Sequence, residues 1–120
     1  MTYMPMMWTR PICVGETALF ARQAESIWSN DERSAFIDFI ARNPEAGDLI
    51  PDTGGVRKVR WKRQGSGKRG GARVIYFYYQ ADKPLYLLMV YAKAQREDIS
   101  PSEKHAVQEL AARLKRAGKS

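Results

Sequence analysis

Residues 56–93 read VRKVRWKRQGSGKRGGARVIYFYYQADKPLYLLMVYAK. Three runs within this stretch, 56–63, 73–81 and 85–93, are rich in β-branched and aromatic residues, which are typical of strands. The turn Asp82-Lys83-Pro84 joins the last two runs and is short enough to make them antiparallel neighbours. The second half of the chain is therefore predicted to form a small antiparallel sheet.

Two helices are predicted before this sheet. The first is indicated by apolar residues at helical spacing: Leu19, Phe20, Ala24, Ile27 and Trp28. The second begins at Ser29, because a Glu three residues later, Glu32, completes a capping box. Its buried stripe is predicted to comprise Phe36, Ile37, Phe39 and Ile40. Pro44 then ends the helix, since the residue before a proline disfavours helical geometry.

A last helix is predicted from Pro101 to Arg116, because Ser100 and Glu103 combine an N-cap with a capping carboxylate. Helices, then strands, then a helix are typical of an α+β domain. We expect two N-terminal helices packed on one face of a small antiparallel sheet, followed by a C-terminal helix. The 120 residues suffice for one core and make one domain, 1–120, in which residues 1–10 are expected to be disordered.

The chain is basic, with 20 Lys and Arg against 13 Asp and Glu and a net charge of +7. Such an excess favours a polyanionic partner, because each phosphate that Lys or Arg contacts releases condensed counterions. Solubility is the alternative explanation. The uneven distribution of the charges along the chain favours nucleic acid.

Several other classes of protein find no support in the sequence. A single Cys13 excludes an internal disulfide and a cysteine metal cluster, and we expect it to be a small buried side chain. No run approaches the roughly 20 apolar residues that cross a bilayer, and the opening residues lack a cationic leader, so a cytoplasmic location is expected. Loop 64–71 lacks the ending of a P-loop, and His105 lacks the partners of a hydrolase triad. No cofactor or metal is expected.

Cations concentrate between Thr53 and Ala81, where there is no Asp or Glu. Eight Lys and Arg residues lie there: Arg57, Lys58, Arg60, Lys62, Arg63, Lys68, Arg69 and Arg73. Because alternate side chains of a strand share a face, Lys58, Arg60 and Lys62 are predicted to lie opposite Arg57, Val59 and Trp61. Cations about 7 Å apart along a strand can hold successive phosphates. The stretch therefore predicts an RNA-binding sheet, with a merely solvated surface as the alternative.

Aromatic residues follow these cations on the next two strands. Aromatic side chains beside cations can stack on unpaired bases, at roughly 1–3 kcal/mol per base. They are also good strand formers, and core packing is the better prediction for most of them. Tyr76 and Tyr78 are the stacking candidates, and the predicted RNA-binding residues are Arg57, Lys62, Lys68, Arg69 and Tyr76.

Four stretches, 47–51, 53–61, 67–76 and 85–88, closely resemble HigB-type toxins of the RelE superfamily. They read GDLIP, TGGVRKVRW, GKRGGARVIY and LYLL. The predicted helices follow the same order, so the resemblance covers residues 12–115. It implies a RelE-like fold and a type II toxin that inhibits translation as an mRNA interferase, cleaving messenger RNA in the ribosomal A site.

The resemblance also implies a metal-independent endoribonuclease, in which a ribose 2′-OH attacks the adjacent phosphate and leaves a cyclic phosphate and a 5′-OH. Its catalytic surface corresponds to Lys58, Arg60, Arg73 and the loop after Lys93. Arg60 and Arg73 would hold the phosphate, and Lys58 is the candidate base because arginine stays protonated. Some relatives place an Arg and a Tyr where this chain has Ala94 and Ser100, so Lys93 is the substitute candidate for the general acid.

The expected partners are a HigA-like helix-turn-helix antitoxin, the ribosome and messenger RNA. DNA would be bound only through the antitoxin, and no membrane is involved. Two alternatives use the same cations without cleavage: an RNA- or ribosome-binding module, and a decayed toxin that acts only in an antitoxin complex.

Overall fold

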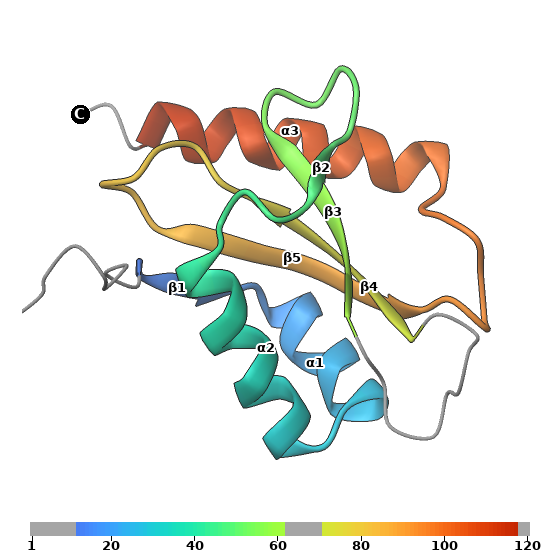
Figure 1. Cartoon of the computed structure of the whole chain (residues 1–120). Helices are drawn as coiled ribbons and strands as arrows, with labels where there is room; N and C mark the ends of the chain where they lie inside the picture. The colour runs from blue at the N-terminus through green and yellow to red at the C-terminus, as the bar shows by residue number, and fades with distance from the viewer. Residues whose placement is uncertain (1–11, 62–70, 118–120) are drawn as a thin grey trace, which may run out of the picture.

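Five strands form one mixed sheet in the computed structural model, which describes residues 12–61 and 71–117 (Figure 1). They are β1 (Val14–Glu16), β2 (Asp48–Leu49), β3 (Val56–Trp61), β4 (Ala72–Phe77) and β5 (Leu85–Ala92), in the spatial order β1-β5-β4-β3-β2. The three long strands pair antiparallel, as predicted, and β2 pairs antiparallel with β3. A short β-like run was predicted at residues 11–14, close to β1, but the parallel pairing of β1 with β5 was not predicted.

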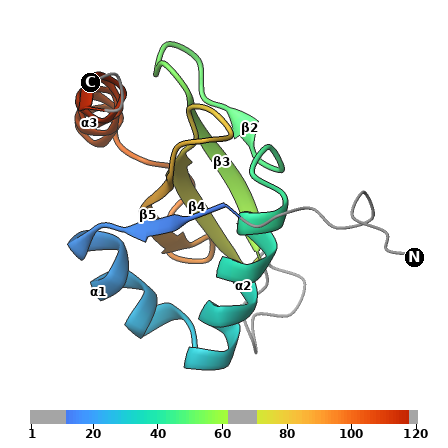
Figure 2. The same ribbon diagram turned by 90° about the vertical axis from the view of Figure 1, so that its left-hand side faces the viewer.

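Helices cover both faces of the sheet (Figure 2). α1 (Ala18–Ile27) and α2 (Asn30–Arg42) pack on one face, as predicted, and α3 (Pro101–Ala117) packs on the other. β4 and β5 accommodate both layers because almost every one of their residues is buried, with apolar side chains on both sides. None of the helices in the described ranges is both long and apolar enough to span a membrane.

The core below α1 and α2 is aromatic. Phe36 of α2 stacks on Trp28 with ring centroids 5.3 Å apart, and its edge meets Trp61 of β3 at 5.4 Å. Phe20 of α1 completes the group, 6.3 Å from Trp28. The second core joins α3 to the sheet through Val107 and Ala111, which pack against residues such as Ile75.

The start of α2 confirms the predicted capping box. The Ser29 side chain accepts a hydrogen bond from the Glu32 backbone N–H at 3.1 Å, and the Glu32 carboxylate accepts one from the Ser29 backbone N–H at 2.9 Å. The helix ends at Arg42, shortly before Pro44, as the sequence predicts.

We expect Ser29→Ala to lower the free energy of unfolding by about 1 kcal/mol, because the Glu32 N–H loses its side-chain acceptor. Chemical denaturation of the purified protein measures this difference. Ser34→Ala is the matched control, since Ser34 is exposed within the same helix and its loss is expected to change stability by less than about 0.5 kcal/mol. Equal losses in the two variants would contradict the capping role.

Tyr76 holds the connector between α2 and β3, residues 43–55, in place. Its hydroxyl donates to the Pro44 carbonyl and accepts from the Gly47 N–H, each at 2.8 Å. Gly47 is required there, because a Cβ would lie 2.9 Å from the Lys58 carbonyl oxygen and from the Tyr76 ring. This contact brings the two-residue strand β2, which was not predicted, against β3.

Two expectations concern the N-terminal part of the chain. Residues 1–10, predicted to be disordered, lie outside the described residues. Cys13 was expected to be buried, and this was wrong, because it is exposed. It lies just before β1, an edge strand of three residues with no neighbour on its outer side within the described sheet.

Candidate nucleic-acid interface

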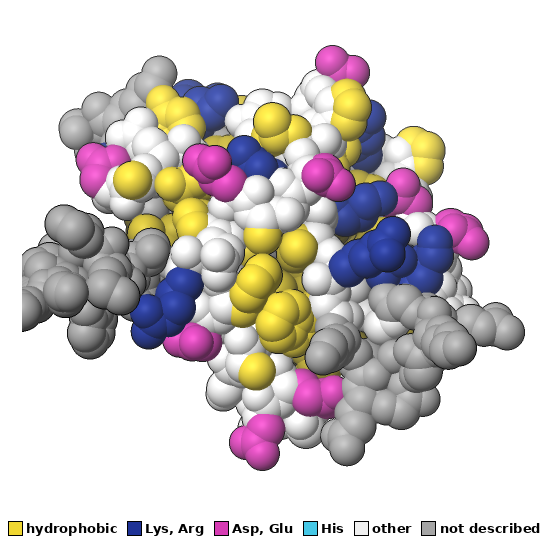
Figure 3. All heavy atoms as spheres, in the orientation of Figure 1, with side chains coloured by type: hydrophobic (Ala, Val, Ile, Leu, Met, Phe, Trp, Pro, Cys, Tyr) yellow, Lys and Arg dark blue, Asp and Glu magenta, His cyan; other side chains and the backbone are white. Residues whose placement is uncertain are grey.

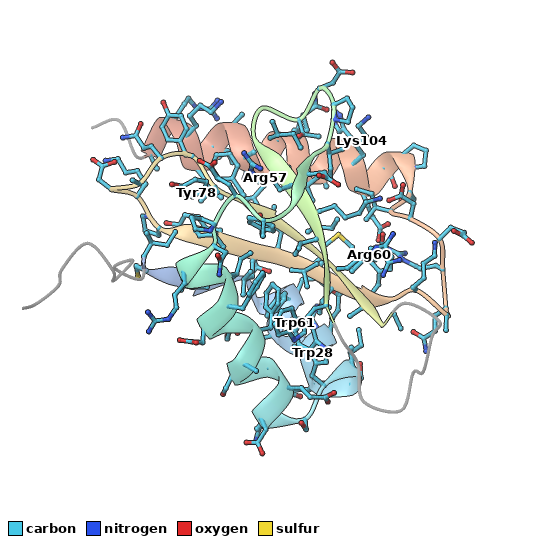
Figure 4. All side chains as sticks on the ribbon, viewed as in Figure 1. Trp28, Arg57, Arg60, Trp61, Tyr78 and Lys104 are labelled. Carbon is cyan, nitrogen blue, oxygen red and sulfur yellow. The ribbon has the colours of Figure 1, made fainter. Side chains whose placement is uncertain are left out.

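The alternation predicted for β3 is present. Val59 and Trp61 pack toward α1 and α2, and the Trp61 ring lies 4.8 Å from that of Phe39 (Figure 4). Lys58 and Arg60 therefore lie on the opposite side of the strand, which is the side of α3. Packing of Val59 and Trp61 in the core thus sets the direction of the two cations.

Four predicted catalytic cations form what we term the cationic face: Lys58, Arg60, Arg73 and Lys93. Arg60 and Arg73 are direct partners across β3 and β4, and Lys93 follows the end of β5, where its N–H donates to the Gly71 carbonyl at 3.0 Å. Figure 3 shows Lys and Arg side chains gathered at one side of the molecule, and Figure 4 places Arg60 there.

The pairing of Arg60 with Arg73 has an electrostatic consequence. Like charges directly opposite on one face of a sheet destabilise it, and Arg73 is 91% buried, with only 9% of its surface exposed. The Glu97 carboxylate is close enough for the Arg73 charge to lower its pKa, so it offsets part of this repulsion. A phosphate near the two arginines would offset more, because guanidinium groups match phosphate oxygens in geometry. The arrangement therefore suits a phosphate.

Carboxylates from one segment pair with cations at this surface. Asp98 Oδ1 lies 3.3 Å from Lys58 Nζ, and Glu97 Oε1 lies 2.7 Å from Lys93 Nζ. Burial opposes ionisation of Asp98, but hydrogen bonds from the Ile99 N–H and Lys58 outweigh it and lower the Asp98 pKa. The hydrogen bond from Lys93, together with its charge, likewise lowers the pKa of Glu97. The segment after β5 thus orients the two lysines.

Tyr91 is a site residue that the sequence analysis did not single out. Tyr91 is on β5, directly opposite Arg73 of β4. Its hydroxyl donates a hydrogen bond to Asp98 at 3.4 Å, and the Arg96 guanidinium lies 4.9 Å from the centroid of its ring. Burial and the neighbouring Asp98 charge raise the pKa of Tyr91 to about 12. The phenol therefore stays protonated at neutral pH and remains a hydrogen-bond donor beside the cationic face.

Two predicted RNA-binding residues lie elsewhere. The prediction that Tyr76 stacks on a base was wrong, because its side chain is fully buried and its hydroxyl forms hydrogen bonds with the connector. Arg57 points away from the cationic face, and its guanidinium donates to the carbonyls of Gly47 at 2.7 Å and Glu45 at 3.3 Å. Tyr78 is half-buried just beyond β4.

Three further predicted residues, Lys62, Lys68 and Arg69, lie outside the described residues. His105 is exposed on α3, and its Nε2 lies 3.3 Å from Glu109 Oε2. Within residues 12–61 and 71–117, no group of three or more His, Cys, Asp or Glu side chains is arranged to hold a metal ion.

The lowered pKa of Asp98 predicts a dependence of stability on pH. Because the folded-state pKa lies below the ordinary value of 3.8, the contribution of Asp98 is present above that value and is lost as the pH falls through the folded pKa. We expect Asp98→Asn to unfold more easily than wild type by up to about 1 kcal/mol at neutral pH. Urea unfolding should show this difference shrinking as the pH falls below 3.8, whereas a constant difference would contradict the prediction.

Two comparisons with known proteins agree with this architecture. A family model described as the RelE toxin of the RelE/RelB toxin-antitoxin system matches residues 16–120. A solved structure of a double mutant of the E. coli toxin RelE in the free state aligns with a TM-score of 0.55 at 12% sequence identity, over 84% of this chain and 97% of that chain. This likeness confirms the expected RelE-like α+β fold, and the family match extends over most of the sequence. The chain therefore belongs to the RelE toxin family.

Proposed function

We propose that this toxin inhibits translation by cleaving messenger RNA on the ribosome, as a metal-independent endoribonuclease. The observation that carries the proposal is the pairing of Arg60 and Arg73 across two strands, with Lys58 on the same side of the sheet. Phosphate recognition needs such convergent cations, and a sheet holds them more rigidly than a loop would.

The proposed chemistry is the attack of a ribose 2′-OH on the adjacent phosphate, which leaves a cyclic phosphate and a 5′-OH. Negative charge builds on the phosphate oxygens in the transition state, and fixed cations stabilise it without reorganisation. Arg60 and Arg73 are assigned this role. Lys58 is the candidate base, and Lys93 is the candidate acid that protonates the leaving 5′-oxygen.

The ion pairs of Lys58 with Asp98 and of Lys93 with Glu97 affect which form of RNA is bound. An RNA phosphate that approaches Lys58 or Lys93 competes with a carboxylate 3.3 Å or 2.7 Å away. Free RNA is therefore expected to bind these cations less tightly than their positive charge alone suggests. Message held in place by the ribosome loses less entropy on binding, and this favours ribosome-bound RNA as the substrate.

Membership of the RelE toxin family implies an antitoxin partner. We propose a HigA-like helix-turn-helix antitoxin, which would also supply the only contact with DNA. A cytoplasmic location follows from the proposed work on ribosomes.

Primer extension on a defined message in a bacterial translation extract tests the proposal. Wild-type protein is expected to cut the message only when translation proceeds, and not when initiation is blocked or when the RNA is free. Uncut message with translation still inhibited would replace the nuclease with a binding module. Uncut message with normal translation would indicate a decayed toxin.

A further inference from the structure

Two neighbouring carboxylates, Glu97 and Asp98, which we term the acidic pair, contact both lysines assigned to proton transfer. Glu97 Oε1 lies 2.7 Å from Lys93 Nζ, and Asp98 Oδ1 lies 3.3 Å from Lys58 Nζ. Lys58 belongs to β3 and Lys93 follows β5, so the two ion pairs reach across β4, which lies between these strands. β4 carries Arg73 on the same side of the sheet as Lys58. The acidic pair therefore lies where the RNA phosphate is assigned.

The charge of Arg73 supports this position independently. The hydrogen bond from Lys93 and its charge lower the pKa of Glu97, and the charge of Arg73 lowers it further. Charges at a protein surface are largely screened from one another beyond about 10 Å. Figure 3 shows acidic side chains next to the Lys and Arg side chains that gather at this side of the molecule. The acidic pair is thus close to a phosphate-binding arginine as well as to the lysines.

Asp98 engages donors of the cationic face through a single oxygen, Oδ1. This oxygen accepts hydrogen bonds from Lys58 Nζ at 3.3 Å and from the Tyr91 hydroxyl at 3.4 Å. The Ile99 N–H donates to the same oxygen at 2.8 Å. A phosphate oxygen is likewise an anionic acceptor, and it would use the same two side-chain donors. The Asp98 carboxylate therefore occupies the hydrogen-bonding position of a phosphate oxygen.

Hydrogen bonds hold both ends of the segment that carries the acidic pair, residues 93–100, which runs from β5 to α3 (Figure 1). After β5, the N–H groups of Gln95 and Arg96 donate to the Ala92 carbonyl at 3.0 and 3.3 Å. At the start of α3, the Ser100 N–H donates to the Glu103 carboxylate at 2.8 Å. Because the backbone is fixed at both ends, little conformational entropy is lost when the two ion pairs form.

The acidic pair can nevertheless be displaced. The Glu97 side chain is 87% exposed and that of Asp98 is 59% exposed, and ion pairs of exposed groups are weak. The ribosome holds a message at a high effective concentration beside the bound toxin, so its phosphates can replace both carboxylates. Free RNA has to compete with the carboxylates at its own, much lower concentration.

We infer that the acidic pair is an intramolecular competitor of RNA phosphates, and that it determines the preference for ribosome-bound over free RNA. The inference rests on the proposed function and deepens it by naming the residues that set this preference. It makes Glu97 and Asp98 specificity residues, and neither is assigned a step in the cleavage reaction.

Fluorescence anisotropy with a labelled, single-stranded 2′-O-methyl RNA tests the inference, because this probe binds but cannot be cleaved. The double variant Glu97→Gln/Asp98→Asn is expected to bind the probe about five- to tenfold more tightly than wild type, since both lysines lose their competing carboxylates. The matched control is Glu25→Gln/Asp82→Asn, which removes the same charge from exposed residues of α1 and of the turn between β4 and β5. The control is expected to gain less than about twofold.

Cleavage assays separate this inference from the nuclease proposal. In the translation extract, the double variant is expected to cut ribosome-bound message within about threefold of the wild-type rate, and also to cut free message, which wild type leaves intact. Equal affinities of the double variant and the control for the probe would overturn the inference and leave the nuclease intact. The same conclusion follows if the double variant leaves free message uncut while wild type cuts message on the ribosome. Tighter binding by the double variant, with no cleavage of any message by wild type, would retain the competitor and overturn the nuclease.

Discussion

Lys58→Ala is expected to lower the rate of message cleavage about 10²–10³-fold, the usual cost of removing a proton-transfer group or a charge that stabilises the transition state. Lys58 lies on the same side of β3 as Arg60, which is the direct partner of Arg73 across the sheet. Primer extension in the translation extract, read as a time course, measures the loss.

We expect Lys58→Ala to change the free energy of unfolding only slightly. Lys58 forms one partly exposed ion pair, with Asp98, and such pairs contribute about 0–1 kcal/mol. Lys83→Ala is the matched control, because Lys83 lies in the turn between β4 and β5, at the other end of the sheet from the segment after β5 (Figure 1). A similar loss of cleavage in the Lys83 variant would contradict a specific role of Lys58.

Lys58→Arg separates the two roles that a lysine can have. Arginine keeps the positive charge but does not give up its proton, so it can hold a phosphate and cannot act as a base. If Lys58 moves the proton, cleavage stays at least tenfold below wild type, while binding to the ribosome is retained. Full activity of Lys58→Arg would assign Lys58 to phosphate binding and leave the base to another group.

Phe36→Ala is expected to lower the free energy of unfolding by about 3–5 kcal/mol, since truncation of a buried phenylalanine leaves a cavity. Phe36 is fully buried, and its ring contacts Trp28 and Trp61. The loss is a large share of the roughly 5–15 kcal/mol that stabilises a typical domain. Urea unfolding followed by tryptophan fluorescence measures it directly, because the two indoles line the cavity.

The neighbouring residue provides the control. Ile37 is only partly buried on α2, so Ile37→Ala is expected to cost less than half as much as Phe36→Ala. Equal losses in the two variants would contradict the assignment of Phe36 to the centre of the core.

Local features of the fold could be predicted because neighbouring residues determine them. The Ser29 capping box requires only a hydroxyl and a carboxylate three residues apart, and both hydrogen bonds are present. The alternation in β3 follows from the pleat of a strand, so the common direction of Lys58 and Arg60 was predictable. α3 was likewise predicted to within a residue, from Ser100, Pro101 and Glu103.

The errors arise where residues distant in the sequence meet. Tyr76 is buried because the connector around Gly47 folds over it, and no pattern within β4 indicates this contact. The pleat predicted that Arg57 faces away from Lys58, but its hydrogen bond to the Gly47 carbonyl, which removes it from the RNA-binding residues, was not predictable. The ion pair between Asp98 and Lys58 could not be predicted, because forty residues separate the two and they meet only after the strands between them have formed the sheet.

Local spacing and residue type were enough to predict the three helices, the three long strands, the basic character of β3 and the family resemblance. Two features became visible only in the folded chain: α3 covers the second face of the sheet, and β1 joins the sheet in parallel. Both faces of β4 and β5 are apolar, and local periodicity does not specify which element covers which face. The tertiary structure also decided the composition of the site. Arg60 faces Arg73, Tyr91 joins them, and the carboxylates of the segment after β5 reach the lysines only once the strands have paired in register.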